Sequence, residues 1–295
     1  MAECYSRKLE RMIFMANTIE TPVIQKEDIK LSRSVAAMNS IHQPVVVVVD
    51  NSVSMTSIEP GEIRSNLKIA EDMINEIGTD ANLTLAEQQT VDFSVLNFHD
   101  MVELQQNWIP MSLFERNVKL ENGGCTSFYE AVIQSIYACK ALFEVYKANG
   151  ITCKRPQIFM FTDGFPTDDE HAEEARELCQ HYLEGKYPKC RLHVILLPGS
   201  SDKAAKSLSK EIRTYAIKDC RHGLPTALDF INSSIVTFSS NAVGSRFTMQ
   251  MNANYMVPGK SQGVVDTKTG IATTVADTVD IVENDDIYQF AGSQA

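Results

Sequence analysis

The hydrophobic residues of the chain fall into runs that alternate between strand-like and helix-like spacing. The strongest run is Val45–Val49, five valines in succession, which predicts a strand buried on both faces in the middle of a parallel sheet. Apolar residues at helical spacing follow over 63–77, and Gly78 is suited to end that helix. Further apolar runs predict strands at 91–98, 101–108 (as an edge strand), 157–162 and 191–197.

Helical segments are expected between and after these strands. Ser127 with Glu130, and Thr167 with Glu170, have the Ser/Thr-x-x-Glu spacing of a helix capping box. Strands that alternate with helices of this length indicate a doubly wound, mostly parallel α/β sheet, in which ligands bind beyond the carboxyl ends of the strands. The remaining predicted helices cover 127–146, 167–184, 201–215 and 224–239.

Composition and hydrophobic periodicity divide the chain into a main domain and two extensions. Residues 1–39 are mixed polar sequence with weak periodicity, and residues 40–243 carry all the strong elements. Residues 244–295 form a smaller C-terminal extension rich in Gly, Thr and Val. Short β-like runs at 246–250 and 273–282 predict hairpins there, with a partly disordered tail as the alternative.

Composition narrows the classes of function. The formal net charge of −11 argues against a broad nucleic-acid-binding surface, which needs a basic stripe. The longest strongly apolar run has five residues, far below the roughly 20 that a membrane helix requires, and no secretory signal is recognisable. Seven scattered cysteines without CxxC spacing predict reduced, mostly buried thiols. A cytoplasmic protein is therefore expected.

Three polar loops are expected on one rim of the sheet. Residues 50–54 (Asp-Asn-Ser-Val-Ser) follow the valine strand, 123–127 (Gly-Gly-Cys-Thr-Ser) precede a helix, and 162–168 (Thr-Asp-Gly-Phe-Pro-Thr-Asp) follow another buried strand. Mg²⁺ selects oxygen ligands, and these loops supply two carboxylates and three hydroxyls. Each residue alone could equally cap a helix. The combination predicts a metal site built from Asp50, Ser52, Ser54, Thr126 and Asp163.

The three loops together resemble the metal-ion-dependent adhesion site of the von Willebrand factor type A (vWA) family. The likeness covers roughly residues 40–243, with D-x-S-x-S, a Thr in a Gly-rich loop and T-D-G in the expected order. The T-D-G-x-P-T-D sequence at 162–168 also resembles the bacterial tellurium-resistance TerY-like branch. One departure is Val53, where many members have Gly; this position supplies no oxygen side chain, so the ligand set is retained.

The resemblance implies a Rossmann-like vWA fold and a non-enzymatic, Mg²⁺-dependent protein-interaction module in a stress-response or signalling assembly, with Mn²⁺ as an alternative ion. It implies that the hydroxyls bind the metal directly, that at least one Asp acts through water, and that a partner's Asp or Glu completes the coordination. A protein kinase or phosphatase is the partner class that the TerY-like branch suggests. The partner-facing rim is then expected to comprise Asn51, Gly124, Gly164 and Asp168.

Two alternatives stay open at this stage. The chain could be a Mg²⁺-dependent phosphatase or phosphotransferase with Asp50 as its nucleophile. Such a site would want a second Asp two residues later, where the chain has Ser52, and no Gly-rich phosphate loop with Lys is present. The chain could also have the same fold with a vestigial site. Direct measurement of metal binding separates the vestigial site from the other two.

Overall fold

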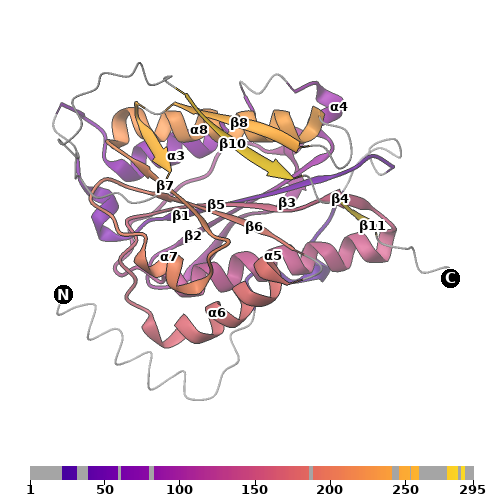
Figure 1. The fold of residues 1–295 in the computed structure, drawn as a ribbon, viewed down its shortest axis with the longest axis horizontal. Coiled ribbons are helices and arrows are strands. Elements are labelled where there is room, and N and C mark those ends of the chain that lie inside the picture. The colour runs from indigo at the N-terminus through magenta and orange to yellow at the C-terminus, as the bar shows by residue number, and fades with distance from the viewer. Residues whose placement is uncertain are drawn as a thin grey trace.

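A seven-stranded, mostly parallel sheet forms the centre of the computed structural model (Figure 1). The structure describes residues 22–31, 39–58, 61–79, 83–185, 189–240, 246–252, 254–258, 278–284 and 287–289. The strands of the sheet are β1 (Gln43–Asp50), β2 (Val91–Phe98), β3 (Val102–Pro110), β5 (Gln157–Thr162), β6 (Arg191–Leu196), β7 (Arg213–Ile217) and β9 (Met256–Pro258).

The order of the strands in the sheet is β3-β2-β1-β5-β6-β7-β9. The five inner strands pair in parallel, and β3 and β9 are antiparallel strands at the two edges. The sheet therefore has the doubly wound, mostly parallel arrangement that the sequence predicts, with 101–108 at an edge. The chain builds the sheet outward in both directions from β1, which pairs in parallel with β2 on one side and with β5 on the other.

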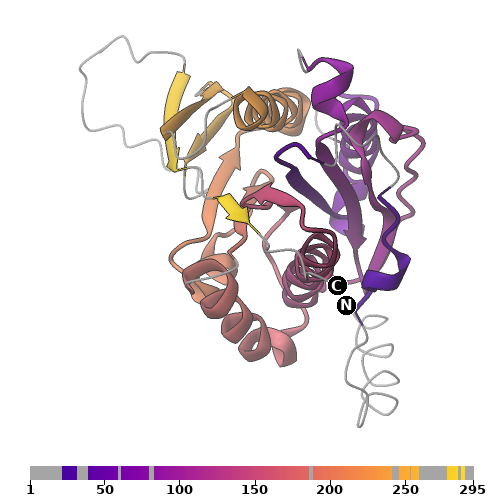
Figure 2. The same ribbon diagram turned by 90° about the vertical axis from the view of Figure 1, so that its right-hand side faces the viewer.

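Helices cover both faces of the sheet, as the end-on view shows most plainly (Figure 2). On one face lie α3 (Asn66–Glu76) and α8 (Cys220–Ser240), and on the other lie α5 (Phe128–Asn149), α6 (Ala172–Cys179) and α7 (Lys203–Leu208). Val45, Val47 and Val49 belong to the core under α3 and α8, whereas Val46 and Val48 belong to the core under α5. Both faces of β1 are thus buried, which is why the five central positions, Val45–Val49, are all apolar.

Shorter elements complete the described chain. The short helical turns are η1 (Lys26–Asp28), η2 (Val53–Thr56), α4 (Leu85–Gln88), η3 (Met111–Leu113), η4 (Asp169–His171) and the π-helical η5 (Gln180–Glu184). The remaining strands are β4 (Thr152–Lys154), β8 (Arg246–Asn252), β10 (Thr278–Asn284) and β11 (Ile287–Gln289). None of the helices within the described residues combines the length and hydropathy needed to cross a membrane.

The extensions contribute to the main sheet and its core. Strand β9 pairs with β7, and β11 pairs with β4. Strands β8 and β10 fall in the two runs that were predicted to form hairpins; they pair antiparallel with each other and lie beside α8 in Figure 1, and residues 273–277 are outside the described residues. At the other end of the chain, Ile24 and Ile29 are buried in the core that α5 covers.

The predicted helix over 201–215 is wrong in its second half. The helix α7 ends at Leu208, and residues 213–217 form β7, which pairs in parallel with β6. Residues 214–217 are all buried between the two helical layers, so their pattern lacks the alternation of a half-exposed strand. A short apolar run of this kind cannot be assigned to a strand or a helix by periodicity alone.

The two predicted capping boxes are also wrong. Ser127 precedes α5 without a side-chain cap, and that helix start is instead capped by Asp168, whose Oδ2 accepts a hydrogen bond of 2.8 Å from the Glu130 backbone N–H. Residues 169–171 form a 3₁₀ turn, so α6 begins at Ala172. A capping box does occur at the start of α4, between Thr84 and Glu87.

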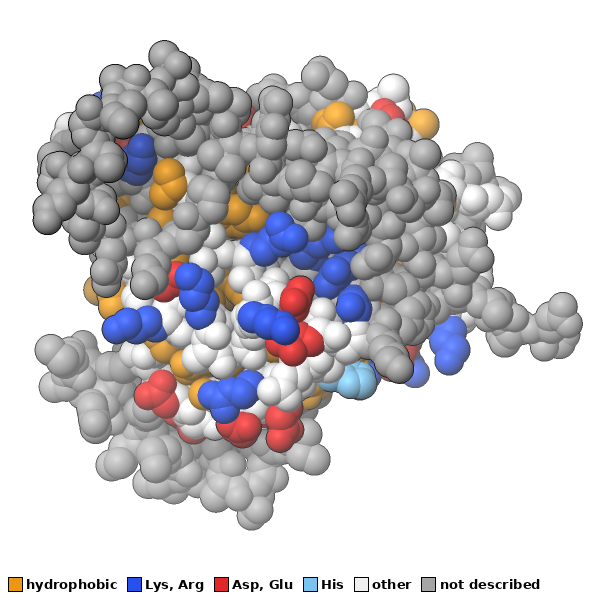
Figure 3. Space-filling model, in the orientation of Figure 1, with side chains coloured by type: hydrophobic (Ala, Val, Ile, Leu, Met, Phe, Trp, Pro, Cys, Tyr) orange, Lys and Arg blue, Asp and Glu red, His pale blue; other side chains and the backbone are white. Residues whose placement is uncertain are grey.

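Although the net charge of the chain is −11, acidic side chains do not form a continuous surface on the face drawn in Figure 3. On the face drawn in Figure 3, Lys and Arg side chains stand next to Asp and Glu side chains. Charges of opposite sign therefore lie near one another on this face, and single charges there are expected to have small effects on stability.

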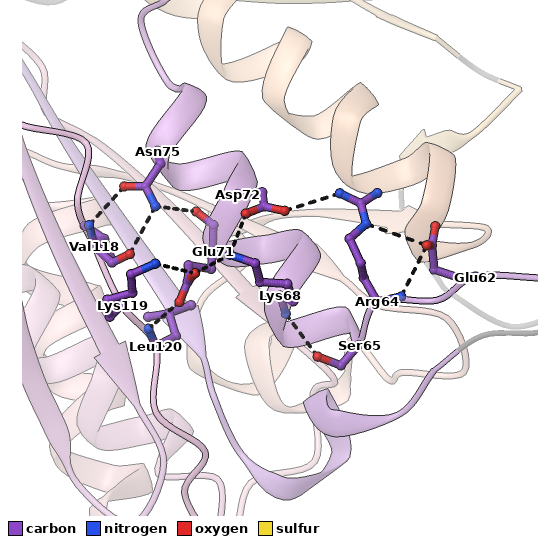
Figure 4. Close-up of polar contacts among 10 residues, drawn as sticks. All are labelled: Glu62, Arg64, Ser65, Lys68, Glu71, Asp72, Asn75, Val118, Lys119 and Leu120. Atoms are coloured by element: carbon purple, nitrogen blue, oxygen red, sulfur yellow. Dashed lines mark hydrogen bonds and ion pairs between the residues drawn. The ribbon is translucent and has the colours of Figure 1, made fainter.

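A buried carboxylate ties α3 to the segment that leads into the second polar loop (Figure 4). Glu71 accepts hydrogen bonds from Lys68 Nζ at 2.6 Å, Lys119 Nζ at 3.3 Å and the Leu120 backbone N–H at 3.0 Å. One turn further along the helix, Asn75 both donates to and accepts from the backbone of Val118 at 3.0 Å. The backbone of residues 118–120 is thereby fixed against the helix.

Glu71→Gln is expected to lower the free energy of unfolding by about 1–2 kcal/mol at neutral pH, because charged hydrogen bonds are replaced by weaker ones. Burial by itself would raise the pKa of Glu71, but the three donors outweigh it and hold the pKa below its usual value. A carboxylate whose pKa is lowered by folding stabilises the folded state at pH values above its unfolded pKa, about 4.3 for Glu. This stabilisation is lost as the pH falls through the folded pKa. Urea titrations should therefore show a smaller difference in the free energy of unfolding between the unchanged protein and Glu71→Gln at pH 4 than at pH 7. Glu76→Gln, an exposed position on the same helix, is the control.

Candidate metal site

The site begins at Asp50, the last residue of the central strand β1. Its side chain is fully buried, with 0% of its surface exposed. One carboxylate oxygen accepts the Ser52 backbone N–H at 2.9 Å, and the other accepts the Thr162 hydroxyl at 2.9 Å from the end of β5. Two adjacent strand ends therefore fix the orientation of this carboxylate.

A line of hydrogen bonds leads from Asp50 outward to Asp163. The hydroxyl oxygens of Ser52 and Ser54 lie 2.9 Å apart, and the Ser54 hydroxyl donates to Asp163 Oδ2 at 2.6 Å. The other oxygen of Asp163 accepts the Phe165 backbone N–H at 3.2 Å. The structure thus brings four of the five predicted ligands together, although they come from loops more than 100 residues apart in the chain.

Thr126, the fifth predicted ligand, lies in a loop that is tied to both of the others. Its backbone N–H donates to the Thr167 hydroxyl at 3.1 Å, and its carbonyl accepts the Thr167 N–H at 2.9 Å. On the other side, the Val53 N–H donates to the Gly124 carbonyl at 3.4 Å. Thr126 itself is buried, and its hydroxyl makes no hydrogen bond to the other four residues, all of which the structure describes.

The two carboxylates of the site, Asp50 and Asp163, favour the binding of a cation. Burial, together with the negative charge of Asp163, raises the pKa of Asp50 to about 7, against the lowering effect of the hydrogen bonds from Ser52 and Thr162. Every side-chain donor of the predicted set is an oxygen, which suits a hard divalent ion such as Mg²⁺. Within the described residues no group of three or more His, Cys, Asp or Glu could hold a metal, and here two carboxylates are joined by hydroxyls instead.

Three of the four residues predicted to face a partner are corrected by their burial. Asn51 is 0% exposed: its side chain donates to the Glu121 carbonyl, and its own carbonyl accepts the Gly123 N–H at 2.9 Å. Asp168 is 5% exposed and caps α5, and Gly164 is buried as well. These residues hold the loops in place, and of the four only Gly124 is exposed.

Asp100 is a residue of the site that the sequence reasoning missed. It follows β2, and its carboxylate accepts the backbone N–H groups of Gly124 at 3.3 Å and Cys125 at 3.0 Å. Gly123 lies so close to His99 that an added Cβ would be 2.1 Å from the His99 Cβ. The available signal was the position of Asp100 just after a predicted strand that is the neighbour of β1.

Asp100→Ala is expected to weaken metal binding about tenfold, because a residue that orients a ligand loop typically contributes that much to affinity. Asp100→Asn keeps a side-chain carbonyl acceptor for one of the two backbone groups, so its loss should be smaller. Calorimetric titration with Mn²⁺ measures both affinities. An affinity of Asp100→Ala equal to that of the unchanged protein would show that the loop holds its position without this carboxylate.

The cysteines of the described residues are mostly buried thiols, as predicted. Burial raises the pKa of Cys139 and Cys153 well above the usual value and that of Cys179 to about 12, which keeps these groups protonated and unreactive. Cys125 is an exception, because it is disulfide-bonded and not a free thiol. The free, buried cysteines are Cys139, Cys153, Cys179, Cys190 and Cys220.

Comparisons with known proteins find distant likenesses in structure. No protein-family profile and no curated protein matches the chain. Among solved structures, the chain is similar to the ArnB paralog VWA2 from Sulfolobus acidocaldarius (20% identity, TM-score 0.44, covering 65% of this chain and 45% of that one). It is also similar to the PilB minor pilin from Streptococcus sanguinis (12%, 0.47, 68% and 64%).

A third similar structure is that of proximal thread matrix protein 1 from the mussel byssus with a zinc-occupied MIDAS motif (15% identity, TM-score 0.46, covering 67% of this chain and 47% of that one). The chain spans less than two thirds of the length of each of these three structures. With such low identities and TM-scores, the fold class rests on the strand order of this chain itself.

Proposed function

We propose that this chain is a vWA-like interaction module that binds a divalent cation, Mg²⁺ in the first place, and through it a carboxylate of a protein partner. The ligands are Asp50, Ser52, Ser54, Thr126 and Asp163. One observation carries the proposal, namely the continuous line of hydrogen bonds from the buried Asp50 through both serines to Asp163.

The arrangement favours an ion that stays attractive to an outside anion. A bound cation would supply positive charge at the rim of the sheet. Three of its protein ligands are neutral hydroxyls, so that charge is only partly compensated by the protein. Asp50 is enclosed, whereas Ser54 is exposed and Asp163 is half-buried, so a partner approaches from the side of Ser54 and Asp163.

We propose binding as the function, and no catalysis. A carboxylate that accepts a phosphoryl group has to contact its substrate. Both oxygens of Asp50 are occupied by hydrogen bonds, and its side chain has no exposed surface. No contact among the described residues therefore favours the phosphatase or phosphotransferase alternative.

The finer assignments rest on the resemblance of the motifs. We propose that the chain works in a stress-response or signalling assembly of the TerY-like, tellurium-resistance type, in the cytoplasm, with a protein kinase or phosphatase among its partners. The T-D-G-F-P-T-D sequence at 162–168 supports this assignment. Its third residue, Gly164, has a φ of +71° in the structure, a conformation that suits glycine.

The immobilised chain is expected to retain specific proteins from a cell extract in Mg²⁺ and to release them when EDTA is added. Asp163→Ala should retain none of them, because it removes a ligand while leaving both hydrogen bonds of the buried Asp50 in place. Asp169→Ala, an exposed acidic residue of the same loop region, is the matched control and should behave as the unchanged chain. Equal retention in EDTA, or by Asp163→Ala, would contradict the proposed function.

A further inference from the structure

Exposed apolar side chains gather on the rim that carries the metal site. The structure describes eight large apolar side chains that are exposed, and five of them follow the carboxyl ends of β1, β2 and β5. These strands are neighbours in the sheet, so the loops that follow them emerge side by side. Scattered apolar residues are normal on a protein surface, but a group of them marks a contact surface. The five are Val53, Ile58, Ile63, Met101 and Phe165.

Two of these residues border the candidate metal ligands directly. Val53, 54% exposed, stands between Ser52 and Ser54 in the chain, and Phe165, 55% exposed, comes two residues after Asp163. Their loops are joined to each other by the hydrogen bond from Ser54 to Asp163. The two apolar side chains therefore lie beside the point at which a partner's carboxylate would arrive.

The backbones that carry these side chains are already fixed. The Val53 N–H donates to the Gly124 carbonyl at 3.4 Å, and the Phe165 N–H donates to Asp163 Oδ1 at 3.2 Å. Val53 also begins the 3₁₀ turn η2, which continues to Thr56. Ordering a loop on binding reduces affinity, so a rim that is fixed beforehand can use most of its apolar area for binding.

The charges around the rim limit what the partner can carry. Asp100 and Glu121 flank the second loop, and the whole chain has a net charge of −11. A second acidic group beside the metal-bound carboxylate would face this negative field without a cation of its own. Apolar neighbours meet no such repulsion and match the exposed Val53 and Phe165.

We infer that the partner is a protein segment with a single Asp or Glu bracketed by large apolar side chains, which pack on Val53 and Phe165. This inference rests on the proposed function, and it names the chemistry of the partner that the metal site binds. The carboxylate provides the interaction with the cation, and the apolar neighbours distinguish this segment from other acidic segments.

Three capped peptides of equal length, with Leu-Glu-Leu, Gly-Glu-Gly or Leu-Gln-Leu at their centres, test the inference on the full chain in Mg²⁺ by calorimetry. The Leu-Glu-Leu peptide is expected to bind about tenfold more tightly than Gly-Glu-Gly, because the leucines bury apolar surface on the rim. The Leu-Gln-Leu peptide should not bind, because it lacks the carboxylate.

Substitutions on the rim test which side chains produce the preference for Leu-Glu-Leu over Gly-Glu-Gly. Val53→Ser and Phe165→Ser should each remove most of the preference for Leu-Glu-Leu and leave the affinity for Gly-Glu-Gly unchanged. Leu113→Ser is the matched control, because Leu113 is 54% exposed but follows β3, whose Pro110 pairs with Asp92 at the opposite end of β2. This variant should keep the full preference.

The outcomes separate the two proposals. Equal binding of Leu-Glu-Leu and Gly-Glu-Gly, both lost in EDTA, would overturn the inference and leave the proposed function standing. A preference that persists unchanged in Val53→Ser and Phe165→Ser would also overturn it. Absence of binding by both glutamate peptides, in a protein that a Mn²⁺ titration shows to be loaded, would overturn the proposed function and the inference together.

Discussion

Asp50→Asn is expected to stabilise the metal-free protein and to abolish its response to Mg²⁺. Burial and the nearby Asp163 raise the pKa of Asp50 to about 7, so above that pH the ionised carboxylate lowers the stability of the fold. Asparagine keeps an acceptor for the Ser52 N–H and removes the buried charge. In EDTA at pH 8 the variant should therefore gain about 1–3 kcal/mol in its free energy of unfolding.

When metal is added, the unchanged protein is expected to become more stable than Asp50→Asn. At a hundredfold excess of Mg²⁺ over its dissociation constant, the unchanged protein gains about 2.7 kcal/mol, and the variant gains nothing. Urea titrations with EDTA and with Mg²⁺ measure both effects. Asp169→Asn, an exposed acidic position, serves as the control and should match the unchanged protein in both conditions. A variant that is less stable in EDTA and still responds to Mg²⁺ would show that Asp50 has only a structural role.

Gly164→Ala is expected to lower the free energy of unfolding by about 2–5 kcal/mol. Gly164 has a φ of +71°, and an added Cβ would lie 2.3 Å from the backbone carbonyl oxygen of Ser201. The left-handed conformation costs about 1–2 kcal/mol for alanine, and forcing the two segments apart costs about 1–3 kcal/mol more. Because the obstacle is backbone, it cannot turn away as a flexible side chain could.

The same substitution should weaken metal binding, since a displaced residue 164 moves the adjacent Asp163. Gly199→Ala is the matched control: its φ is +81°, but nothing lies within 4 Å of the added Cβ. That variant should lose only about 1–2 kcal/mol and keep its Mn²⁺ affinity. If urea and Mn²⁺ titrations gave the same losses for both glycines, close contact with Ser201 would not be what requires glycine at 164.

The sequence predicted the parts of the fold that depend on local pattern. Five consecutive valines can be buried on both faces only in a strand covered by two helical layers, and β1 is in that position. The pattern failed for residues 213–217, because the run 214–217 is buried throughout and so has no periodicity from which to predict a strand. Whether such a run becomes a strand depends on a free edge beside β6, which local sequence does not reveal.

The candidate site likewise contains residues that local sequence predicted and residues whose roles it did not. Asp50 and Asp163 were predictable, because both come at or just after the ends of strands that are neighbours in the sheet. The roles of Asn51 and Asp168 were not, because their hydrogen-bond partners lie 70 and 38 residues away along the chain. Asp100 was missed for the same reason, since its carboxylate binds backbone groups 24 and 25 residues later.

The amino-acid sequence alone determined the parallel α/β sheet and the oxygen-rich residues at its carboxyl rim, because strand periodicity and the positions of strand ends are local properties. Only the tertiary structure decided which of the loop side chains turn inward to hold the loops and which stay exposed beside the metal site. That choice follows from contacts between segments far apart in the chain, where burial of a polar group requires a partner that the neighbouring residues do not supply.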